Sequence, residues 1–90
     1  MSQGKQISTS ISPHALQAIK DIGAMARQAR LSAGEGQAAA AGRLGVHVQT
    51  IGRIESGEAG VAIGHVLGML ALYGLTVAAK PPEASGPSTP

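Results

Sequence analysis

Apolar residues recur at helical intervals over much of the chain. Ser12 and Pro13 are typical of an N-cap and a first helical position. After them, apolar side chains return every three or four positions, at Leu16, Ile19, Ile22, Ala26 and Ala29. This pattern predicts a long first helix that runs to about Ser32.

Glycines divide the next part of the chain into short elements. Gly34 and Gly36 interrupt the first helix, and the alanine-rich run 37–44 favours a second, short helix. Gly45 can adopt the positive φ that ends a helix and turns the chain. In residues 47–56 the apolar and polar side chains fall on opposite faces, which predicts a third helix with a polar outer side.

The last part of the pattern predicts one more helix and a strand. A further apolar stripe ends at Gly74 and consists of Ile63, Val66, Leu67, Leu70 and Ala71. The alternation in 75–79 then favours a short strand. The expected fold class is all-α, with four to five helices and a short C-terminal strand, formed by residues 12–80.

Both ends differ from this central part. Residues 1–11 are expected to form a flexible or extended N-terminal arm, because Ile7, Thr9 and Ile11 alternate with serines. Residues 81–90 contain four prolines and no large apolar residue, so a disordered tail is expected.

Composition narrows the class of protein. Ninety residues suffice for one domain, and the only aromatic residue is Tyr73, so we expect a thin core of small side chains. The chain has no cysteine and no secretory signal pattern, which makes the cytoplasm the expected location. A net charge of +2 is compatible with nucleic-acid binding but does not indicate it alone.

The segment 37–54 meets the requirements of a helix-turn-helix, in which a tight turn holds the second helix across the first. Gln37 can donate to a phosphate, Ala41 is small enough for a close helix crossing, and Gly45 can form the turn. The crevice between the helices is filled by apolar residues, namely Ala40, Leu44, Val46, Ile51 and Ile54.

A family resemblance extends this interpretation. The segment ARQARLSAGEGQAAAAGRLGVHVQTIGRIESGE, residues 26–58, resembles the Cro and XRE family of repressors, whose domain is lambda-repressor-like. The continuation GVAIGHVLGMLALYGLTV resembles a subgroup that includes antitoxins of the HipB kind, in which the last strand joins a dimer partner. The resemblance implies a homodimeric transcriptional regulator, a repressor or autoregulator, that binds a palindromic operator in double-stranded DNA. The alternative is an antitoxin whose main partner is a toxin protein.

The resemblance also implies roles for individual residues. The expected base-contacting residues are His47, Val48, Gln49, Thr50 and Arg53. The expected phosphate-contacting residues are Arg27, Gln37, Arg43, Ser56 and Gly57. Structural roles fall to an Arg30–Glu55 ion pair and to Ala41 and Gly45, and the dimer contacts to Val66, Leu70, Leu75 and Val77.

Three residues depart from the family pattern. Glu35 stands where the family has a buried Leu, so its carboxylate must turn outward or pair with an arginine. Gly36 stands where Ser or Thr caps the second helix, and the loss of such a cap costs about 1 kcal/mol. Glu58 replaces a basic residue and lowers the attraction for phosphates.

Other classes of protein are less well supported. Residues 61–79 carry no formal charge and contain a ladder of glycines, as a dimerising membrane helix does, but His65, Tyr73 and Gly74 argue against one. The Gly34-x-Gly36 pair lacks the preceding strand of a dinucleotide loop. His14, His47 and His65 show no metal-ligand spacing, so no metal, cofactor or enzymatic activity is expected.

Overall fold

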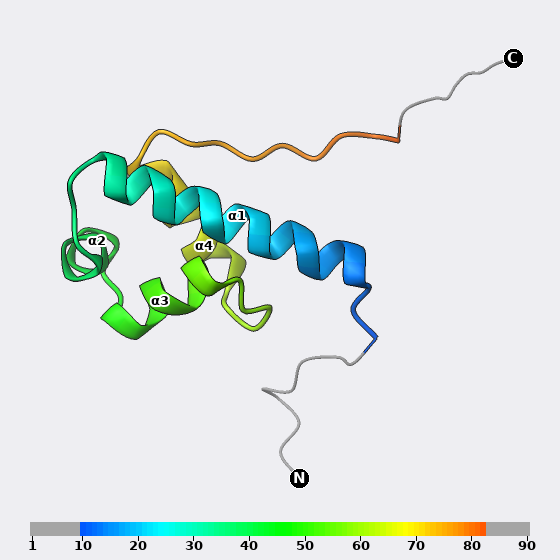
Figure 1. Ribbon diagram of the computed structural model, residues 1–90, viewed down its shortest axis with the longest axis horizontal. Coiled ribbons are helices and arrows are strands. Elements are labelled where there is room, and N and C mark those ends of the chain that lie inside the picture. The colour runs from blue at the N-terminus through cyan, green and yellow to red at the C-terminus, as the bar shows by residue number, and fades with distance from the viewer. Residues whose placement is uncertain (1–9, 83–90) are drawn as a thin grey trace, which may run out of the picture.

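The computed structural model of the protein describes residues 10–82, which form four α-helices and no strand. The helices are α1 Pro13–Ser32, α2 Gln37–Leu44, α3 Val48–Ser56 and α4 Ile63–Leu72. The three shorter helices gather on one side of the long α1 (Figure 1). The predicted all-helical class is therefore confirmed for the described part of the chain. Most of the expected arm, residues 1–11, and of the expected tail, residues 81–90, lies outside the described residues.

The helix ends follow from local chemistry. The Ser12 hydroxyl accepts a hydrogen bond from the amide of Ala15 at 3.0 Å, and Pro13 occupies the first turn of α1. Helix α2 ends at Gly45, whose φ of 79° lies in the left-handed region. The Gly45 amide donates to the carbonyl of Ala41 at 2.8 Å, which closes α2 before the turn into α3.

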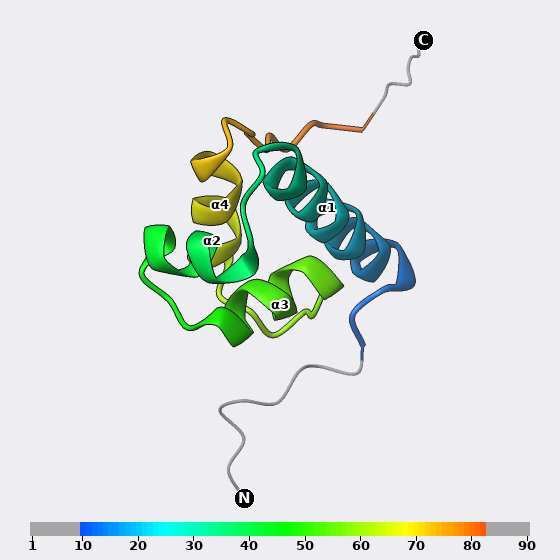
Figure 2. The ribbon, with the colours of Figure 1, turned by 60° about the vertical axis from the view of Figure 1, so that its left-hand side comes forward.

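Two glycines let α1 and α3 approach closely. A Cβ atom at Gly23 would collide with the carbonyl oxygen of Ile54, so no larger residue fits there without separating the helices. Gly57 ends α3 with a φ of 78°, and a Cβ there would lie 2.7 Å from the Cα of Lys20. The C-terminal half of α3 therefore packs directly on the backbone of α1 (Figure 2).

The core is small and is built largely from short side chains, as the composition predicts. Its buried members come from all four helices and are Ala26, Ala40, Ala41, Ile51, Ile54, Met69 and Leu70. The side chains of the three alanines are small, so they permit the helices to pack closely against one another. Partly buried residues, among them Ile22, Leu44 and Tyr73, close the edges of the core.

The chain after α4 is extended rather than paired. The amide of Leu75 donates to the carbonyl of Leu70 at 2.9 Å, and the segment then runs back along α1 (Figure 1). The strand expected at 75–79 is not formed within residues 10–82, because a strand needs a neighbour for its backbone groups and this chain offers none there. None of the described helices has the length and apolar character needed to cross a membrane.

Candidate nucleic-acid interface

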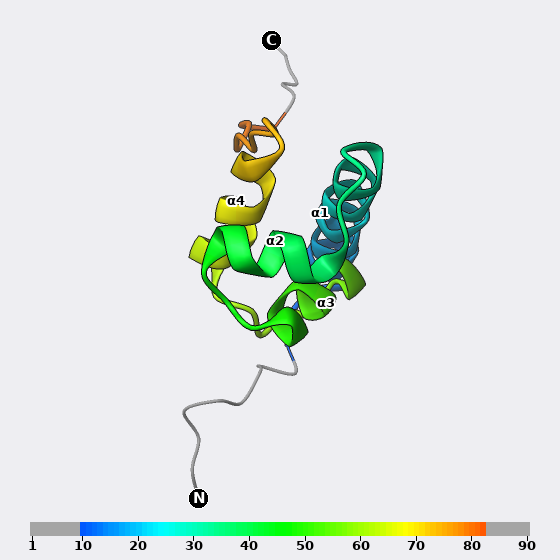
Figure 3. The same ribbon diagram turned by 90° about the vertical axis from the view of Figure 1, so that its left-hand side faces the viewer.

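Helices α2 and α3 form a compact pair joined by the turn at Gly45 (Figure 3). The amide of Val46 donates to the carbonyl of Ala41 at 3.0 Å, so the chain leaves α2 in a fixed direction. Ile51 is fully buried and Ile54 is 3% exposed, and both anchor the inner face of α3 on the core. The position of α3 is therefore set by packing, and its outer face is left to solvent.

The outer face of α3 gathers the residues that the sequence assigns to base contacts. His47, Val48, Gln49 and Arg53 are exposed and Thr50 is half-buried. Gln49 and Arg53 are one helical turn apart and therefore share a face. Together with His47 and Thr50 they line a shallow concave surface. The side chain of Arg53 is 61% exposed, and its nearest acidic group, the Glu58 carboxylate, is 3.9 Å away, so the guanidinium can reach an external acceptor.

A buried ion pair fixes α3 to α1. Arg30 Nε donates to Glu55 Oε2 at 2.6 Å and Arg30 Nη2 donates to Glu55 Oε1 at 3.0 Å, which is a bidentate geometry. The two side chains are 7% and 4% exposed. The structure thus contains the pair that the resemblance implies, and it adds a third contact, in which Arg30 Nη1 donates to the carbonyl of Glu35 at 2.8 Å.

The charge of Glu55 is stabilised from several sides. Burial acts to raise the pKa of this carboxyl, but hydrogen bonds from Arg30 and Gln37 outweigh burial and lower it. Gln37 Nε2 donates to Glu55 Oε1 at 3.0 Å, so the first residue of α2 is tied to α3. The exposed Arg27 also acts on Glu55 through its charge, which places a cation near the start of α2.

Glu35 pairs with an arginine, which is one of the two outcomes that its sequence position allows. Arg43 Nη1 donates to both Glu35 carboxylate oxygens, at 2.8 and 2.7 Å, and the Tyr73 hydroxyl donates to Glu35 Oε1 at 2.8 Å. These hydrogen bonds, first that of Tyr73 and then that of Arg43, lower the pKa of Glu35. The cluster joins the α1–α2 loop to the ends of α2 and α4, and α2 has no side-chain cap at Gly36.

The structure gives three of the expected contact residues partners within the chain. Arg43 pairs with Glu35, stacks 5.4 Å over the Tyr73 ring and donates to the carbonyl of Leu72, while its side chain stays 44% exposed. Gly57 is buried against α1 and its amide already donates to Ile54 at 3.1 Å, which makes it structural. Leu70, expected at a dimer contact, is 3% exposed and belongs to the core of its own chain.

Two basic groups near α3 were missed by sequence reasoning. Lys20 lies beside Gly57 at the end of α3, and His65 of α4 lines the same cleft as Thr50 and Arg53. Lys20 is far from α3 in the sequence and His65 follows it after a loop, so the helix crossings bring the two groups to α3. Ser56 is exposed and its hydroxyl donates to the carbonyl of Arg53 at 3.2 Å.

The described residues contain no group of three or more His, Cys, Asp or Glu side chains placed to hold a metal ion. The model of a family described as helix-turn-helix domain matches residues 21–81, which include all of α2, α3 and α4 and most of α1. Neither the search of the curated proteins nor that of the solved structures gave a match.

Proposed function

Because the chain belongs to the helix-turn-helix domain family, whose members bind DNA, we propose that it is a dimeric transcriptional regulator that reads double-stranded DNA with α3. The observation that carries this proposal is the division of α3 into two faces. Ile51, Ile54 and Glu55 hold the inner face on the core, whereas polar side chains project from the outer face into solvent. A helix of about 10–12 Å diameter fits the major groove, which is about 12 Å wide.

The side chains on the outer face suit base recognition. Gln49 can donate to and accept from adenine in a bidentate manner, whereas Arg53 can donate two hydrogen bonds to O6 and N7 of guanine or reach a phosphate. Val48, 42% exposed, is suited to contact with a thymine methyl group. His47 and Thr50 lie at the start of α3 and complete the proposed base-reading set.

The proposed phosphate contacts are Gln37, Arg27 and Ser56, which flank the outer face of α3. Gln37 spends one amide donor on Glu55 and keeps a second one. Lys20 at the end of α3 joins this set and Arg43, with a side chain that is 44% exposed, stays in it, whereas the buried Gly57 leaves it. Such contacts position the protein on DNA without reading its sequence.

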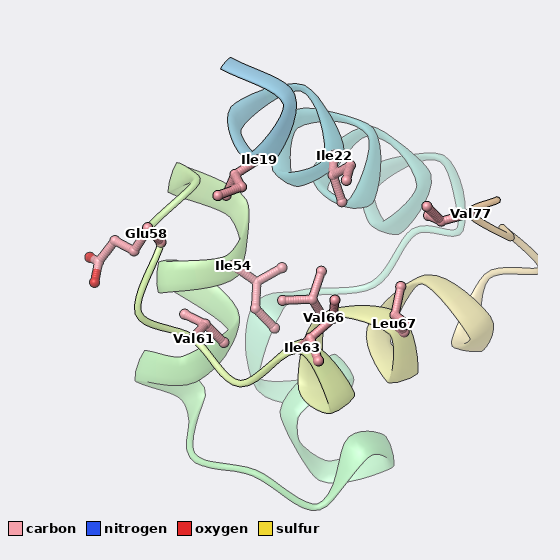
Figure 4. A pocket seen from close by; sticks show the side chains of 10 residues that line it. Ile19, Ile22, Ile54, Glu58, Val61, Ile63, Val66, Leu67 and Val77 are labelled. Atoms are coloured by element: carbon pink, nitrogen blue, oxygen red, sulfur yellow. The ribbon is translucent and has the colours of Figure 1, made fainter. Parts of the chain in front are cut away.

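Dimerisation is proposed through an apolar hollow between α1, α4 and the extended segment 75–79. The hollow has a volume of about 200 Å³, and Figure 4 shows side chains of α1, α4 and Val77 turned toward it. Ile63, Leu67 and Val77 are 73%, 42% and 50% exposed, which leaves an apolar surface in contact with water. A second copy that pairs its own segment 75–79 here would cover this surface and complete a strand, with Val66 and Leu75 at its inner edge.

A dimer of this kind presents two α3 helices to one side of the duplex. On a palindromic operator the two half-sites lie about 34 Å apart, which is one turn of DNA. Binding there would repress transcription by covering a promoter, including that of its own gene. The proposed location is the cytoplasm, where the DNA would be reached. Affinity is expected to fall steeply with salt, because phosphate contacts release counterions.

A fluorescence titration tests the function directly. The wild-type protein is titrated against the DNA upstream of its own gene and against random-sequence DNA, beside a Gln49→Ala, Arg53→Ala variant. We expect preferential binding of the upstream DNA by the wild type and loss of that preference in the variant. Equal, weak binding of all DNA would refute sequence reading by α3.

The dimer has its own test in sedimentation or light scattering. Val77→Asp puts a charge into the hollow and is expected to yield monomers, whereas the matched control Leu31→Asp, which changes an exposed residue outside the hollow, is expected to leave the dimer intact. A wild type that stays monomeric at micromolar concentration contradicts this part of the proposal.

The second candidate function is that of an antitoxin that binds a toxin protein. The observation in its favour is the same exposed apolar hollow, which is also suited to a foreign protein segment. A toxin gene beside this one, and loss of the complex with that toxin in the Val77→Asp variant, would support it. If the wild type binds DNA but forms no complex with a toxin, the antitoxin function is refuted and the transcriptional-regulator function remains.

A further inference from the structure

A cleft beside the outer face of α3 is lined in part by side chains that have no DNA contact in the proposed function. It lies between α3 and the start of α4, has a volume of about 930 Å³, and is lined by Thr50 and Arg53 of α3, by loop residues 58–62 and by His65. It is partly open to solvent, and it is large enough to admit a phosphodiester group.

Three charged or titratable side chains face this cleft, one from each element around it. Arg53 comes from α3, Glu58 from the loop and His65 from the exposed side of α4. The Arg53 guanidinium and the Glu58 carboxylate are 3.9 Å apart and both are largely exposed, so they form only a loose pair. A phosphate that enters the cleft therefore meets one fixed cation, one anion and one imidazole.

We propose that His65 is a further DNA-binding residue. In its protonated form it contacts a backbone phosphate beside Arg53, so the protein takes up a proton when it binds DNA. This inference rests on the proposed function. An imidazole changes its charge in the range of physiological pH, and only the cation adds attraction for phosphate. Arg53 and Glu58 are the charged groups that line the cleft together with His65, and the arriving phosphate adds a negative charge beside them.

The expected effect is measurable in two independent ways. A charge-assisted hydrogen bond to phosphate corresponds to about tenfold in affinity, so binding should tighten by about that factor for each bound subunit, or about a hundredfold for a dimer, as the pH falls from about 8 to about 6. One more phosphate contact also steepens the dependence of log Kobs on log salt by about 0.9 for each subunit, or about 1.8 for a dimer. Both effects are independent of DNA sequence, because a phosphate is the ligand.

The experiment measures binding of a labelled random-sequence duplex of about 30 base pairs, long enough for two half-sites, at several salt concentrations at the two pH values. Wild type is compared with His65→Gln and with His65→Lys, which carries a charge at both pH values. His14→Gln on the first turn of α1 is the matched control, because this histidine is exposed but lines no part of the cleft. His47→Gln tests the other histidine on the same side of the molecule.

We expect His65→Gln to bind as the wild type does at the higher pH and to lose the tightening and the steeper salt slope at the lower one. His65→Lys should bind tightly at both, and His14→Gln should behave as the wild type. Tightening that persists in His65→Gln, or that disappears only in His47→Gln, overturns the inference. DNA binding by the wild type without any pH dependence overturns it too and leaves the proposed function standing, whereas no binding at any pH refutes both.

Discussion

The buried pair between Arg30 and Glu55 gives the sharpest test of how α3 is held. The substitution Glu55→Gln keeps the shape of the side chain and removes its charge. It leaves the Arg30 guanidinium, whose side chain is 7% exposed, without a counterion. It also weakens the contact of Gln37, which donates to the same carboxylate at 3.0 Å.

The expected loss in the free energy of unfolding follows from the burial of the pair. Removal of one partner of a buried pair costs about 3–5 kcal/mol, because the remaining charge stays desolvated. A domain of this size is stable by about 5–15 kcal/mol, so the variant is expected to lose a large share of its free energy of unfolding. Replacement of both residues, in Arg30→Met with Glu55→Leu, removes both charges and is expected to cost much less than the sum of the single changes.

Urea unfolding followed by circular dichroism measures these differences. Glu58→Gln is the matched control, because the same chemical change is made at a side chain that is 57% exposed and is expected to alter stability by less than about 0.5 kcal/mol. A loss below about 1 kcal/mol in Glu55→Gln would refute the reasoning, since the carboxylate would then contribute no more than a surface charge.

Three further predictions concern packing, pH and affinity. In the same urea unfolding experiment, Gly23→Ala is expected to lower stability by about 1–3 kcal/mol, because a Cβ there meets the Ile54 carbonyl. Gly64→Ala, where a Cβ meets nothing within 4 Å, is the control and is expected to be neutral or stabilising. The lowered pKa of Glu55 and Glu35 means that their contribution is complete above the ordinary carboxyl value of 4.5 and is lost as the pH falls below it. Urea midpoints between about pH 7 and about pH 3 should therefore fall, and by less in Glu55→Gln; unchanged midpoints would contradict this. Glu58→Gln is expected to raise DNA affinity by up to about fivefold, because it removes a carboxylate beside Arg53, and an unchanged dissociation constant would show that this carboxylate does not oppose phosphate.

The local signals in the sequence were sufficient to predict where the helices begin and end. Proline after serine, the alanine run and the glycine stops act within a few residues, and α1 and α2 begin and end where these signals predict. The strand at 75–79 is not seen in the single chain, for a complementary reason. Its alternation describes a preference for an extended backbone, but a strand is a property of two segments, and residues 10–82 contain no second one.

The candidate site was predictable only where one helix carries it. The spacing of Gln49 and Arg53 on α3 follows from helix periodicity alone. The partners that reach α3 from other elements, Lys20 and His65, depend on crossing geometry that no local pattern encodes. Arg43 illustrates the same limit, because the sequence offers a cation near α2 but does not reveal that Glu35 pairs with it and that the Tyr73 ring lies against it.

The separation of the two faces of α3 has a consequence for how such a protein can diversify. The residues that hold the helix make no use of its outer side, and exposed positions tolerate substitution within about 0.5 kcal/mol. Changes at Val48, Gln49 and Arg53 are therefore nearly free of folding constraints. A duplicated gene could acquire a new operator through these positions alone, while the scaffold that presents them is inherited unchanged.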